Sequence, residues 1–514
     1  MRTLLSFPVL AGLRFAALSG LLSAACTNGT PGAKLAQGMA QHIAVSPGRA
    51  AAFLIDVAHP DDRAVPDDVL AGDLWLASFE GKGGAQKVGA GVPTSDGAFS
   101  FSRSGDALAY LAAYRFRAGA GELWVATAAG GGQKVSAEAT AFAWAPNESA
   151  LAWVAPGKIG ILKAGFSETI SAPAGGAQSL LWSPDGKRLA VRSAAAAGGH
   201  LWIVDAQTGA KKELAPATSD FAFAPDGALA ALGPPAKGGG DRQLLLEDGA
   251  GAPRALARAT AFAFSPDGKD LALLSTEKKP GEVTGTLSRI VRPAGEPRVL
   301  GQTVSDWRFT PSGDLVFLAG FDLRARAGVL TFAPEGGEPR EIARKVQSFV
   351  VQGKRALYLV QAPQKGDYKI ELWTADLASQ TPPRKIDEGV YGYQLSTDGA
   401  TLFWKARCAG TARSCSLLRA PIDGSTPPLF LSANVAGFDL SQDGTRILIE
   451  QPHRGATRAV DLAAINAMGK PPEQVKPFAI EVDGSSRFAD AAGKRVVYAT
   501  ITAGKGAVYL ADVP

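Results

Sequence analysis

Residues 183–191 read Ser183-Pro184-Asp185-Gly186-Lys187-Arg188-Leu189-Ala190-Val191, and close relatives of this stretch recur along nearly the whole chain. The best copies are FSPDGK at 264–269, FAPDG at 223–227 and LSTDG at 395–399. Proline presets φ near about −65°, aspartate can accept a hydrogen bond from its own backbone, and glycine tolerates positive φ. The stretch therefore predicts a tight turn that joins two antiparallel strands.

Four short strands are expected around each turn. Strict alternation precedes the turn, as in Phe221-Ala222-Phe223, and a short apolar run such as Leu271–Leu274 follows it. A third strand carries a Leu-Trp pair in several units, and a fourth is short and basic, as in Lys211-Lys212. Repetition favours a packing role for the tryptophans of the third strands, which are Trp75, Trp124, Trp202 and Trp373. Repeated four-stranded antiparallel units are typical of the blades of a β-propeller.

The spacing of the turns predicts how many blades there are. Gly186, Gly227 and Gly268 follow one another at intervals of 41 residues (227 − 186 and 268 − 227), which is one blade per interval. Counting turns in this way gives about eleven units, more than the usual 4–8 blades of one ring. We therefore predict two tandem propellers, five plus six blades, over residues 34–257 and 258–514.

The two chain ends complement each other. Lys34-Leu35-Ala36 has the pattern of a fourth strand without the preceding three, whereas the chain stops just after a third strand. A propeller often builds its last blade from both ends, because this removes exposed sheet edges. We predict that N- and C-terminal strands close the ring.

The first residues have the pattern of a secretory signal peptide. Residues 1–25 combine a charged start, an apolar core and small residues before Cys26. Ala24 and Ala25 fit a bacterial lipobox, although Ser23 stands where Leu, Val or Ile is usual. We expect a lipid on Cys26, a tether over residues 26–33, and attachment to the outer membrane, facing the periplasm or the cell exterior. Plain secretion and an uncleaved anchor are the alternatives.

The repeat resembles that of a known group of proteins. The Ser-Pro-Asp-Gly turn with Lys-Arg-Leu-Ala, followed by a Leu-Trp-x-x-Asp strand, is similar to the WD-like repeats of TolB-type periplasmic propellers, and to those of prolyl-oligopeptidase-type peptidases. The resemblance covers about residues 34–514 and implies a propeller fold. It departs from both groups, because no α/β domain precedes the repeats and no hydrolase domain is present.

Composition argues against two classes of protein. Hydrophobic residues make up 46% of the chain and charged residues 20%, which is typical of a globular protein rather than a disordered one. The 53 basic and 48 acidic residues give a net charge of +5, without any run of five like charges. This balance predicts that nucleic acid is not a partner.

Catalytic and metal-binding patterns are weak. Gly165-Phe166-Ser167-Glu168-Thr169 lacks the second glycine of a nucleophile elbow. Four histidines are scattered without i, i+4 partners and are expected on loops or strand surfaces: His42, His59, His200 and His453. The prediction is therefore no catalytic, cofactor-binding or metal-binding residues, and no enzyme.

Two further motifs have ordinary explanations. An acidic cluster near His59 contains Asp61, Asp62, Asp67 and Asp68, where a solvated loop is favoured and calcium binding is the alternative. Residues 205–209, Asp-Ala-Gln-Thr-Gly, resemble part of the repeat of pyrroloquinoline-quinone propellers. They occur once, without its tryptophan, and fit the turn after a third strand better.

Two cysteines lie in one predicted loop. Cys408 and Cys415 are separated by six residues between strands two and three of the ninth unit. In an exported protein this spacing favours a disulfide across a hairpin loop. A redox pair would be more closely spaced, and a metal site lacks neighbouring histidines.

These observations favour a non-catalytic envelope lipoprotein whose propellers bind envelope proteins or cell-wall components. One alternative is an enzyme or small-ligand-binding propeller with its site in the central channel, built from residues distant in sequence. Another is binding of polysaccharide or peptidoglycan through surface aromatic residues.

Overall fold

This computed structural model describes residues 32–513, with gaps at 61–64, 67–68, 81–83, 128–129, 164–165, 172–176, 194–198, 236–239, 250–251, 277–283, 293–294, 365–366, 409–413, 453–459, 470–474 and 503–504. The regular structure of these residues is entirely β-strand, arranged in nine antiparallel sheets, of which seven have four strands and two have seven. The predicted all-β class is therefore confirmed. Within the described ranges, no helix is long and apolar enough to cross a membrane.

The four-stranded sheets are β2 (Ala40–Ser46), β3 (Ala50–Ala58), β4 (Ala71–Ser78) and β5 (Gln86–Pro93); β6 (Phe99–Phe101), β7 (Ala107–Arg115), β8 (Ala120–Thr127) and β9 (Gly130–Ala139); β10 (Ala141–Trp144), β11 (Ala150–Ala155), β12 (Lys158–Lys163) and β13 (Phe166–Ser171); β14 (Ala177–Trp182), β15 (Arg188–Ser193), β16 (Gly199–Asp205) and β17 (Lys211–Thr218); β18 (Asp220–Phe223), β19 (Leu229–Pro235), β20 (Arg242–Glu247) and β21 (Arg254–Ala259); β22 (Ala261–Phe264), β23 (Asp270–Ser275), β24 (Gly285–Val291) and β25 (Arg298–Val304); and β33 (Val390–Leu395), β34 (Thr401–Ala406), β35 (Cys415–Pro421) and β36 (Leu429–Val435).

The first seven-stranded sheet contains β26 (Trp307–Phe309), β27 (Leu315–Asp322), β28 (Ala327–Ala333), β29 (Arg340–Gln352), β30 (Arg355–Gln364), β31 (Asp367–Asp376) and β32 (Arg384–Glu388). The second contains β37 (Gly437–Leu440), β38 (Arg446–Pro452), β39 (Val460–Asn466), β40 (Ala479–Phe488), β41 (Arg495–Thr502), β42 (Lys505–Asp512) and β1 (Ala33–Gln37).

One long strand runs through the middle of each seven-stranded sheet. β29 pairs with β28 through residues 340–346 and with β30 through residues 346–352. β40 pairs with β39 around 479–482 and with β41 through 482–488. Each seven-stranded sheet therefore consists of two four-stranded units that share one strand.

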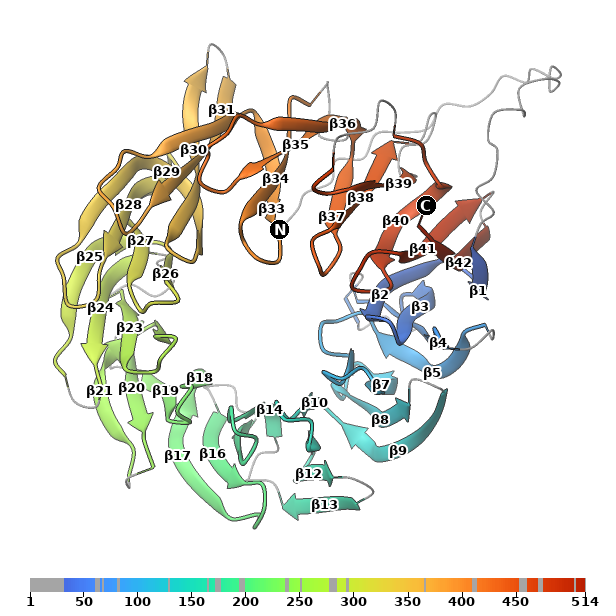
Figure 1. Cartoon of the computed structure of the whole chain (residues 1–514). Coiled ribbons are helices and arrows are strands. Elements are labelled where there is room, and N and C mark those ends of the chain that lie inside the picture. Colours follow the sequence, from blue (N-terminus) through green and yellow to red (C-terminus); the bar gives the residue numbers. More distant parts are fainter. Residues whose placement is uncertain are drawn as a thin grey trace.

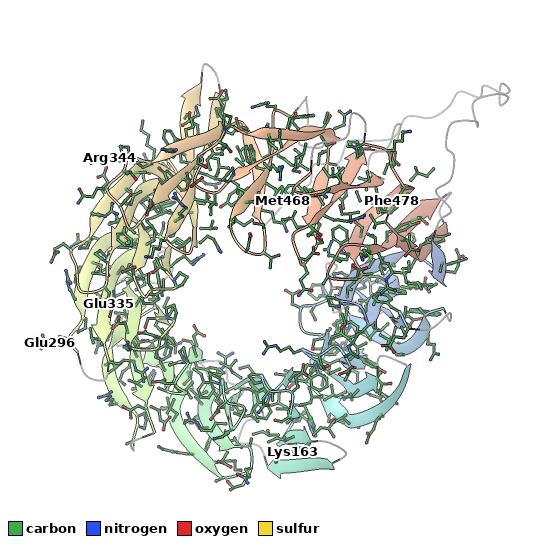
Figure 2. The ribbon with its side chains drawn as sticks, in the orientation of Figure 1. Lys163, Glu296, Glu335, Arg344, Met468 and Phe478 are labelled. Carbon is green, nitrogen blue, oxygen red and sulfur yellow. A yellow bond between two sulfur atoms is a disulfide. The ribbon has the colours of Figure 1, made fainter. Side chains whose placement is uncertain are left out.

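The sheets follow one another around a single ring with a central opening (Figure 1). The opening remains when the described side chains are drawn (Figure 2). The predicted division into two tandem rings differs from this arrangement. β21 contacts β23 across the predicted boundary near residue 257, and β2 contacts β40 and β42 rather than a sheet near that boundary. The repeats can be recognised from the sequence, but the size of the ring depends on the angle between neighbouring sheets, which is set by side-chain packing.

The chain ends meet as predicted. β1 pairs antiparallel with β42, matching Ala33 to Leu510 and Gln37 to Ala507. Leu35 and Ala36 are buried in a cluster that includes Phe53, Val497 and Val508. The N-terminal strand therefore completes a sheet whose other strands come from the C-terminal end, and this sheet packs against β3.

The repeated turn is held by its serine and aspartate. Ser183 Oγ donates to Asp185 Oδ1 at 2.6 Å and accepts from the Arg188 amide at 2.9 Å. Asp185 Oδ1 also accepts from the Lys187 amide at 3.0 Å, and Gly186 has a φ of 70°. We call the side of the ring that carries these turns the turn face.

Apolar side chains of neighbouring sheets pack against each other. Trp182 of β14 lies in one cluster with Val154 of β11 and Ile161 of β12, and its indole Nε1 donates to Ala143 O at 3.0 Å. The hydrophobic core is thus repeated between sheets around the ring rather than gathered in one place.

Candidate functional site

The candidate site lies where the ring closes, on strands at the inner edges of their sheets. Figure 1 shows β37, β40 and β2 following one another around the opening. Three cavities of about 410, 390 and 320 Å³ lie here, and Arg487 lines all of them. Because they share Arg487, we treat them as one region and call it the seam site.

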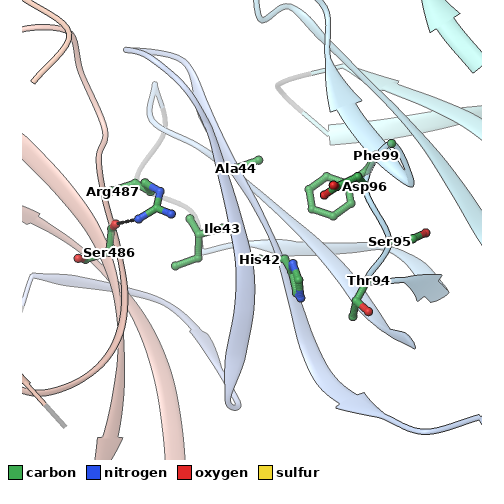
Figure 3. Close-up of a pocket in the computed structure, with 10 residues that line it drawn as sticks. His42, Ile43, Ala44, Thr94, Ser95, Asp96, Phe99, Ser486 and Arg487 are labelled. Carbon is green, nitrogen blue, oxygen red and sulfur yellow. Dashed lines mark hydrogen bonds between the residues drawn. The ribbon is translucent and has the colours of Figure 1, made fainter. Parts of the chain in front are cut away.

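The seam site draws residues from segments far apart in sequence. The close-up in Figure 3 shows β2, with His42 and Ile43, between Arg487 on one side and the segment with Thr94 and Asp96 on the other. The full lining is His42–Val45, Pro47, Thr94–Gly97, Phe99, Gly437–Leu440, Gln442, Leu448, Glu450, Ser486–Phe488 and Asp490.

Arg487 is exposed, and its guanidinium Nη1 donates to the Ser486 carbonyl oxygen at 2.7 Å. A guanidinium carries five N–H donors, so most of its hydrogen-bonding capacity remains available for an acidic or carbonyl group. By contrast, the inner-strand arginine Arg308 is paired with Asp306 at 2.9 Å. Arg487 is therefore a positive charge positioned on the cavity walls.

Glu450 is the half-buried acid of the site. Ser486 Oγ donates to Glu450 Oε1 at 3.4 Å. Burial raises the pKa of Glu450, while Ser486, Arg487 and Lys405 act in the opposite direction. Gly437 makes room for this carboxylate, because a Cβ there would lie 2.3 Å from Glu450 Oε2.

Lys405, which lies on β34, is another charged residue near Glu450. Its Nζ donates to the Ala436 carbonyl oxygen at 2.5 Å, and burial lowers its pKa while Glu450 acts to raise it. Asp439 also acts to raise the pKa of Glu450. The site thus brings two carboxylates and two cationic side chains, those of Arg487 and Lys405, near one another.

His42 lies in a strand bulge. Its φ is 53°, and the register of β2 shifts between Gln41 and Ala44. Nine other described residues with a Cβ also have positive φ, among them Ala217 and Thr303 at bulges of other sheets, so the conformation alone does not mark a functional position. The bulge places an exposed imidazole in the largest cavity of the seam site.

The sequence analysis singled out His42 only as an expected surface residue, and it missed Arg487 altogether. The residue in the middle of the last alternating triplet before a turn is Ala222 or Ala263 in two regular units, and Asp439 or Arg487 at the seam. The same position is Arg308 in β26, away from the seam, so a charge there does not by itself identify the site.

The other histidines do not join it. His59 Nε2 lies 3.2 Å from the carbonyl oxygens of Val65 and Pro66. His200 Nδ1 lies 2.5 Å from Glu213 Oε1 on the neighbouring strand. His453 is outside the described residues.

The weaker motifs have clear positions. Ser167 lies within β13 rather than on a turn, and Gly165 is outside the described residues. Asp205 Oδ1 accepts from the amides of Gln207 and Thr208 at 3.0 and 2.7 Å, so residues 205–209 form a turn after β16, as predicted.

The calcium alternative at the acidic cluster lies outside the described residues, since Asp61, Asp62, Asp67 and Asp68 are not among them. Among the described residues, no group of three or more His, Cys, Asp or Glu side chains could hold a metal ion.

The cysteines of the predicted disulfide lie together. Cys408 follows β34 and Cys415 begins β35, and the structure joins them by a disulfide with Cα atoms 3.9 Å apart. Cys26, the predicted lipid attachment point, is outside the described residues, and its modification stays a prediction.

Comparison with known proteins gives matches of structure only. No family model matches the sequence, and no curated protein matches it. A eukaryotic initiation factor structure is 14% identical, with a TM-score of 0.41, over 70% of this chain and 94% of that one. The tricorn protease is 13% identical, with a TM-score of 0.30, over 76% of this chain and 44% of that one. Prolyl endopeptidases are 13% identical, with a TM-score of 0.32, over 60% and 54%.

These matches correct the prediction that the protein is not an enzyme. Two of the three matched structures are peptidases by name, so likeness to such structures gives no ground for a non-catalytic protein. At these identities and TM-scores the matches carry no argument for a particular reaction either. The fold assignment rests on the sheets of the chain itself.

Proposed function

We propose that the protein is an exported, lipid-anchored propeller of eleven blades that binds a partner of the cell envelope at the seam site. The blade count follows if each seven-stranded sheet counts as two blades that share a strand. The pattern of residues 1–25 before Cys26 and the resemblance of the repeat to TolB-type propellers support an envelope location.

The observation that carries the proposal is the position of Arg487. Its guanidinium borders three cavities at the inner edge of the ring, while Glu450 and Asp439 lie beside it. This combination of charges suits a partner that has an acidic group for Arg487 and hydrogen-bond donors for the two carboxylates. A polypeptide segment supplies N–H donors along its backbone and a carboxylate at its C-terminus.

Photocrosslinking in cells tests this proposal. A benzoylphenylalanine placed at Ser95, an exposed residue of the seam site, is expected to form a defined adduct. The matched control is Glu296, an exposed residue at the outer perimeter of the ring (Figure 2). Adding Arg487→Ala should reduce the Ser95 adduct by about tenfold, the cost of a charged hydrogen bond. Equal adducts at both positions, or no effect of Arg487→Ala, would contradict the proposal.

A small acidic ligand is a second candidate, favoured by the cavity sizes. Volumes of about 410 and 390 Å³ fall in the range of roughly 300–1,000 Å³ that is usual for small-molecule sites. Thermal unfolding with succinate as the probe tests this candidate. A rise in Tm that Arg487→Ala abolishes would favour the small ligand over a polypeptide.

A further inference from the structure

Three sheets share a pairing that the sheet of β33–β36 lacks. In β4, β8 and β31 a tryptophan lies opposite a lysine of the next strand: Trp75 with Lys87, Trp124 with Lys134 and Trp373 with Lys385. In each case an acidic residue two positions before the tryptophan pairs with that lysine. In these three sheets the position is occupied by a solvated cation with its counter-ion, whereas other sheets carry Glu213, Ala255, Val299 or Glu341 there.

The sheet of β33–β36 replaces this arrangement by apolar residues. Leu418 of β35 lies opposite Phe430 of β36, and Ser416 stands two positions before Leu418. Phe430 is 46% exposed, at a register position that carries lysine in three sheets and Val299, which is 56% exposed, in the sheet of β22–β25. An exposed aromatic ring in place of a lysine leaves apolar surface in water, which is unfavourable unless something covers it.

Phe430 has apolar neighbours on the turn face. The adjacent Leu429 is 41% exposed, and Met468, which follows β39, is 57% exposed. Both line a groove of about 270 Å³ together with Pro427 and Arg419. We call Leu429, Phe430 and Met468 the apolar rim.

Arg419 holds the apolar rim together. Its guanidinium donates to the carbonyl oxygens of Ala467 and Met468 at 2.9 and 3.0 Å, and Nη1 lies 3.1 Å from the Met468 sulfur. The segment after β39 is therefore fixed against β35. Met468 projects from a supported position rather than from an unattached loop (Figure 2).

The tether reaches the ring on the same face. Ala33, the first residue of β1, pairs with Leu510, two residues before Asp512, which pairs with Arg495 just after the last turn. The chain therefore enters β1 near the turn face, in the sheet that also contains β39. Six residues lie between Cys26 and Ala33, so seven Cα–Cα steps of at most about 3.6 Å span about 25 Å in all.

A membrane that holds Cys26 would lie within reach of the turn face. Two exposed lysines lie on the same face as the apolar rim, Lys34 in β1 and Lys476 before β40. Apolar side chains with flanking cations are the combination that binds an anionic lipid surface.

We infer that the apolar rim docks on the lipid surface to which Cys26 is anchored, so that the ring rests on its turn face beside β36 and β39. This inference rests on the lipid anchor in the proposed function. It leaves the seam site, at the inner edge of the ring, open to a partner.

Fluorescence quenching by brominated lipids tests the orientation. The lipidated protein is reconstituted in vesicles of phosphatidylethanolamine and phosphatidylglycerol, with a bimane label on Met468→Cys or on Leu323→Cys. Leu323 is the matched control, since it is 60% exposed and follows β27 at the end remote from the turn. A label buried about 5–10 Å into the headgroup boundary should lose about half of its fluorescence at 468, but little at 323.

Phe430→Lys provides a second variant, because it introduces the residue type found at this position in three other sheets. It should fold normally and should lower quenching at position 468, whereas Leu323→Lys should not. Mass spectrometry of Cys26 separates the two failures. A lipidated Cys26 with equal quenching at 468 and 323, or with no effect of Phe430→Lys, overturns the docking surface alone. An unmodified Cys26 overturns the anchor and the docking surface together.

Discussion

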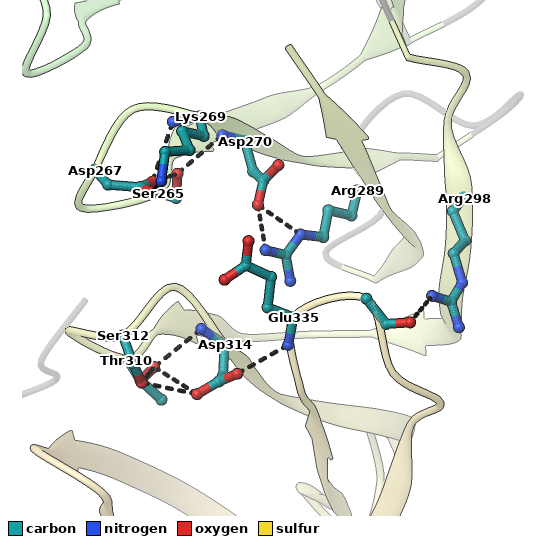
Figure 4. Close-up of polar contacts among 11 residues, drawn as sticks. Ser265, Asp267, Lys269, Asp270, Arg289, Arg298, Thr310, Ser312, Asp314 and Glu335 are labelled. Carbon is teal, nitrogen blue, oxygen red and sulfur yellow. Dashed lines mark hydrogen bonds and ion pairs between the residues drawn. The ribbon is translucent and has the colours of Figure 1, made fainter.

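The sheets of β14–β25 and the seam between β37 and β2 share one strand pattern, but they differ in the polar groups of their turns and inner strands. In the first region, each turn satisfies its own polar groups: Ser265 Oγ donates to Asp267 and accepts from the Asp270 amide, at 2.7 and 2.9 Å (Figure 4). At the seam, the turn at Ser46 lacks the aspartate. The inner strands there carry Arg487 and the exposed His42, which line a cavity.

The difference shows which parts of the ring are stabilised by local hydrogen bonds and which are not. Regular turns close with short local hydrogen bonds and small inward residues such as Ala263. The seam leaves charged side chains and cavities in the same place. The seam lacks the local hydrogen bonds that close the regular turns, and such a departure usually costs stability. A region that keeps this cost is a candidate for function.

The largest expected effect is at ring closure. Leu35→Asp places a charge in the buried cluster of β1 and β42 and should lower the free energy of unfolding by about 3–5 kcal/mol. Leu214→Asp in β17 is the matched substitution in the regular region, where Leu214 is also buried. Urea unfolding should detect both losses.

Limited proteolysis then separates the two variants. Cleavage next to β1 should appear in Leu35→Asp only, because β1 is held by one neighbouring strand and is continuous with the tether. The exposed Lys34→Asp should change little. If Leu214→Asp were cleaved at β1 as well, the seam would not be a separate weak point.

The next largest effect is expected at the turns. Ser265→Ala removes both hydrogen bonds of a buried hydroxyl and should cost about 1–2 kcal/mol in chemical denaturation. Ser46→Ala at the seam should cost about half as much or less, since no aspartate shares its turn. Equal losses would remove the distinction between the two regions.

A smaller effect of opposite sign is expected at His42. Glycine accepts a φ of 53° without strain, so His42→Gly should stabilise the protein by about 0.5–1 kcal/mol. Thermal unfolding measures this gain, with Gln41→Gly, at a neighbouring β2 residue outside the positive-φ set, as the control that should destabilise. A loss of stability in His42→Gly would show that the imidazole supports the fold rather than a ligand.

The smallest effect concerns pH. The pKa of Asp185 is lowered mainly by the Ser183 hydroxyl, so this carboxylate adds stability above its unfolded pKa, and that stability is lost as the pH falls through the lower folded value. Glu450 has the opposite sign: its pKa is raised by burial, so stability present below its unfolded pKa is lost as the pH rises through the folded value.

Glu450→Gln should therefore be more stable relative to the parent at neutral pH than at about pH 4. Lys405, Asp439 and Arg487 face this group and remain in place as its charged surroundings. Denaturant midpoints at the two pH values measure the change. The control Asp185→Asn should lose stability at neutral pH and lose little at low pH. An unchanged difference for Glu450→Gln would place Glu450 in a solvated environment.

Much of the fold could be predicted because the turn is chemically self-contained. Ser183, Asp185 and Gly186 satisfy one another within a few residues, so the strands on both sides can be recognised from sequence alone. The pairing of β1 with β42 could also be predicted, because the N-terminal segment has the pattern of a fourth strand without the first three, and the C-terminal end stops after a third strand. The division into two rings was wrong, because the residues of a turn contain no information on the angle between one sheet and the next.

The candidate site could not be predicted in the same way. Arg487, Glu450, His42 and Asp96 belong to four different repeats and become neighbours only when the ends of the chain close the ring. The amino-acid sequence by itself determined the repeating sheet and its turns, since these depend on contacts between residues near in the chain. It also determined the strand that completes the last sheet, because the strand patterns of the two chain ends complement each other. Only the tertiary structure decided the single ring and the seam site, because both arise from packing between sheets that the backbone does not connect directly.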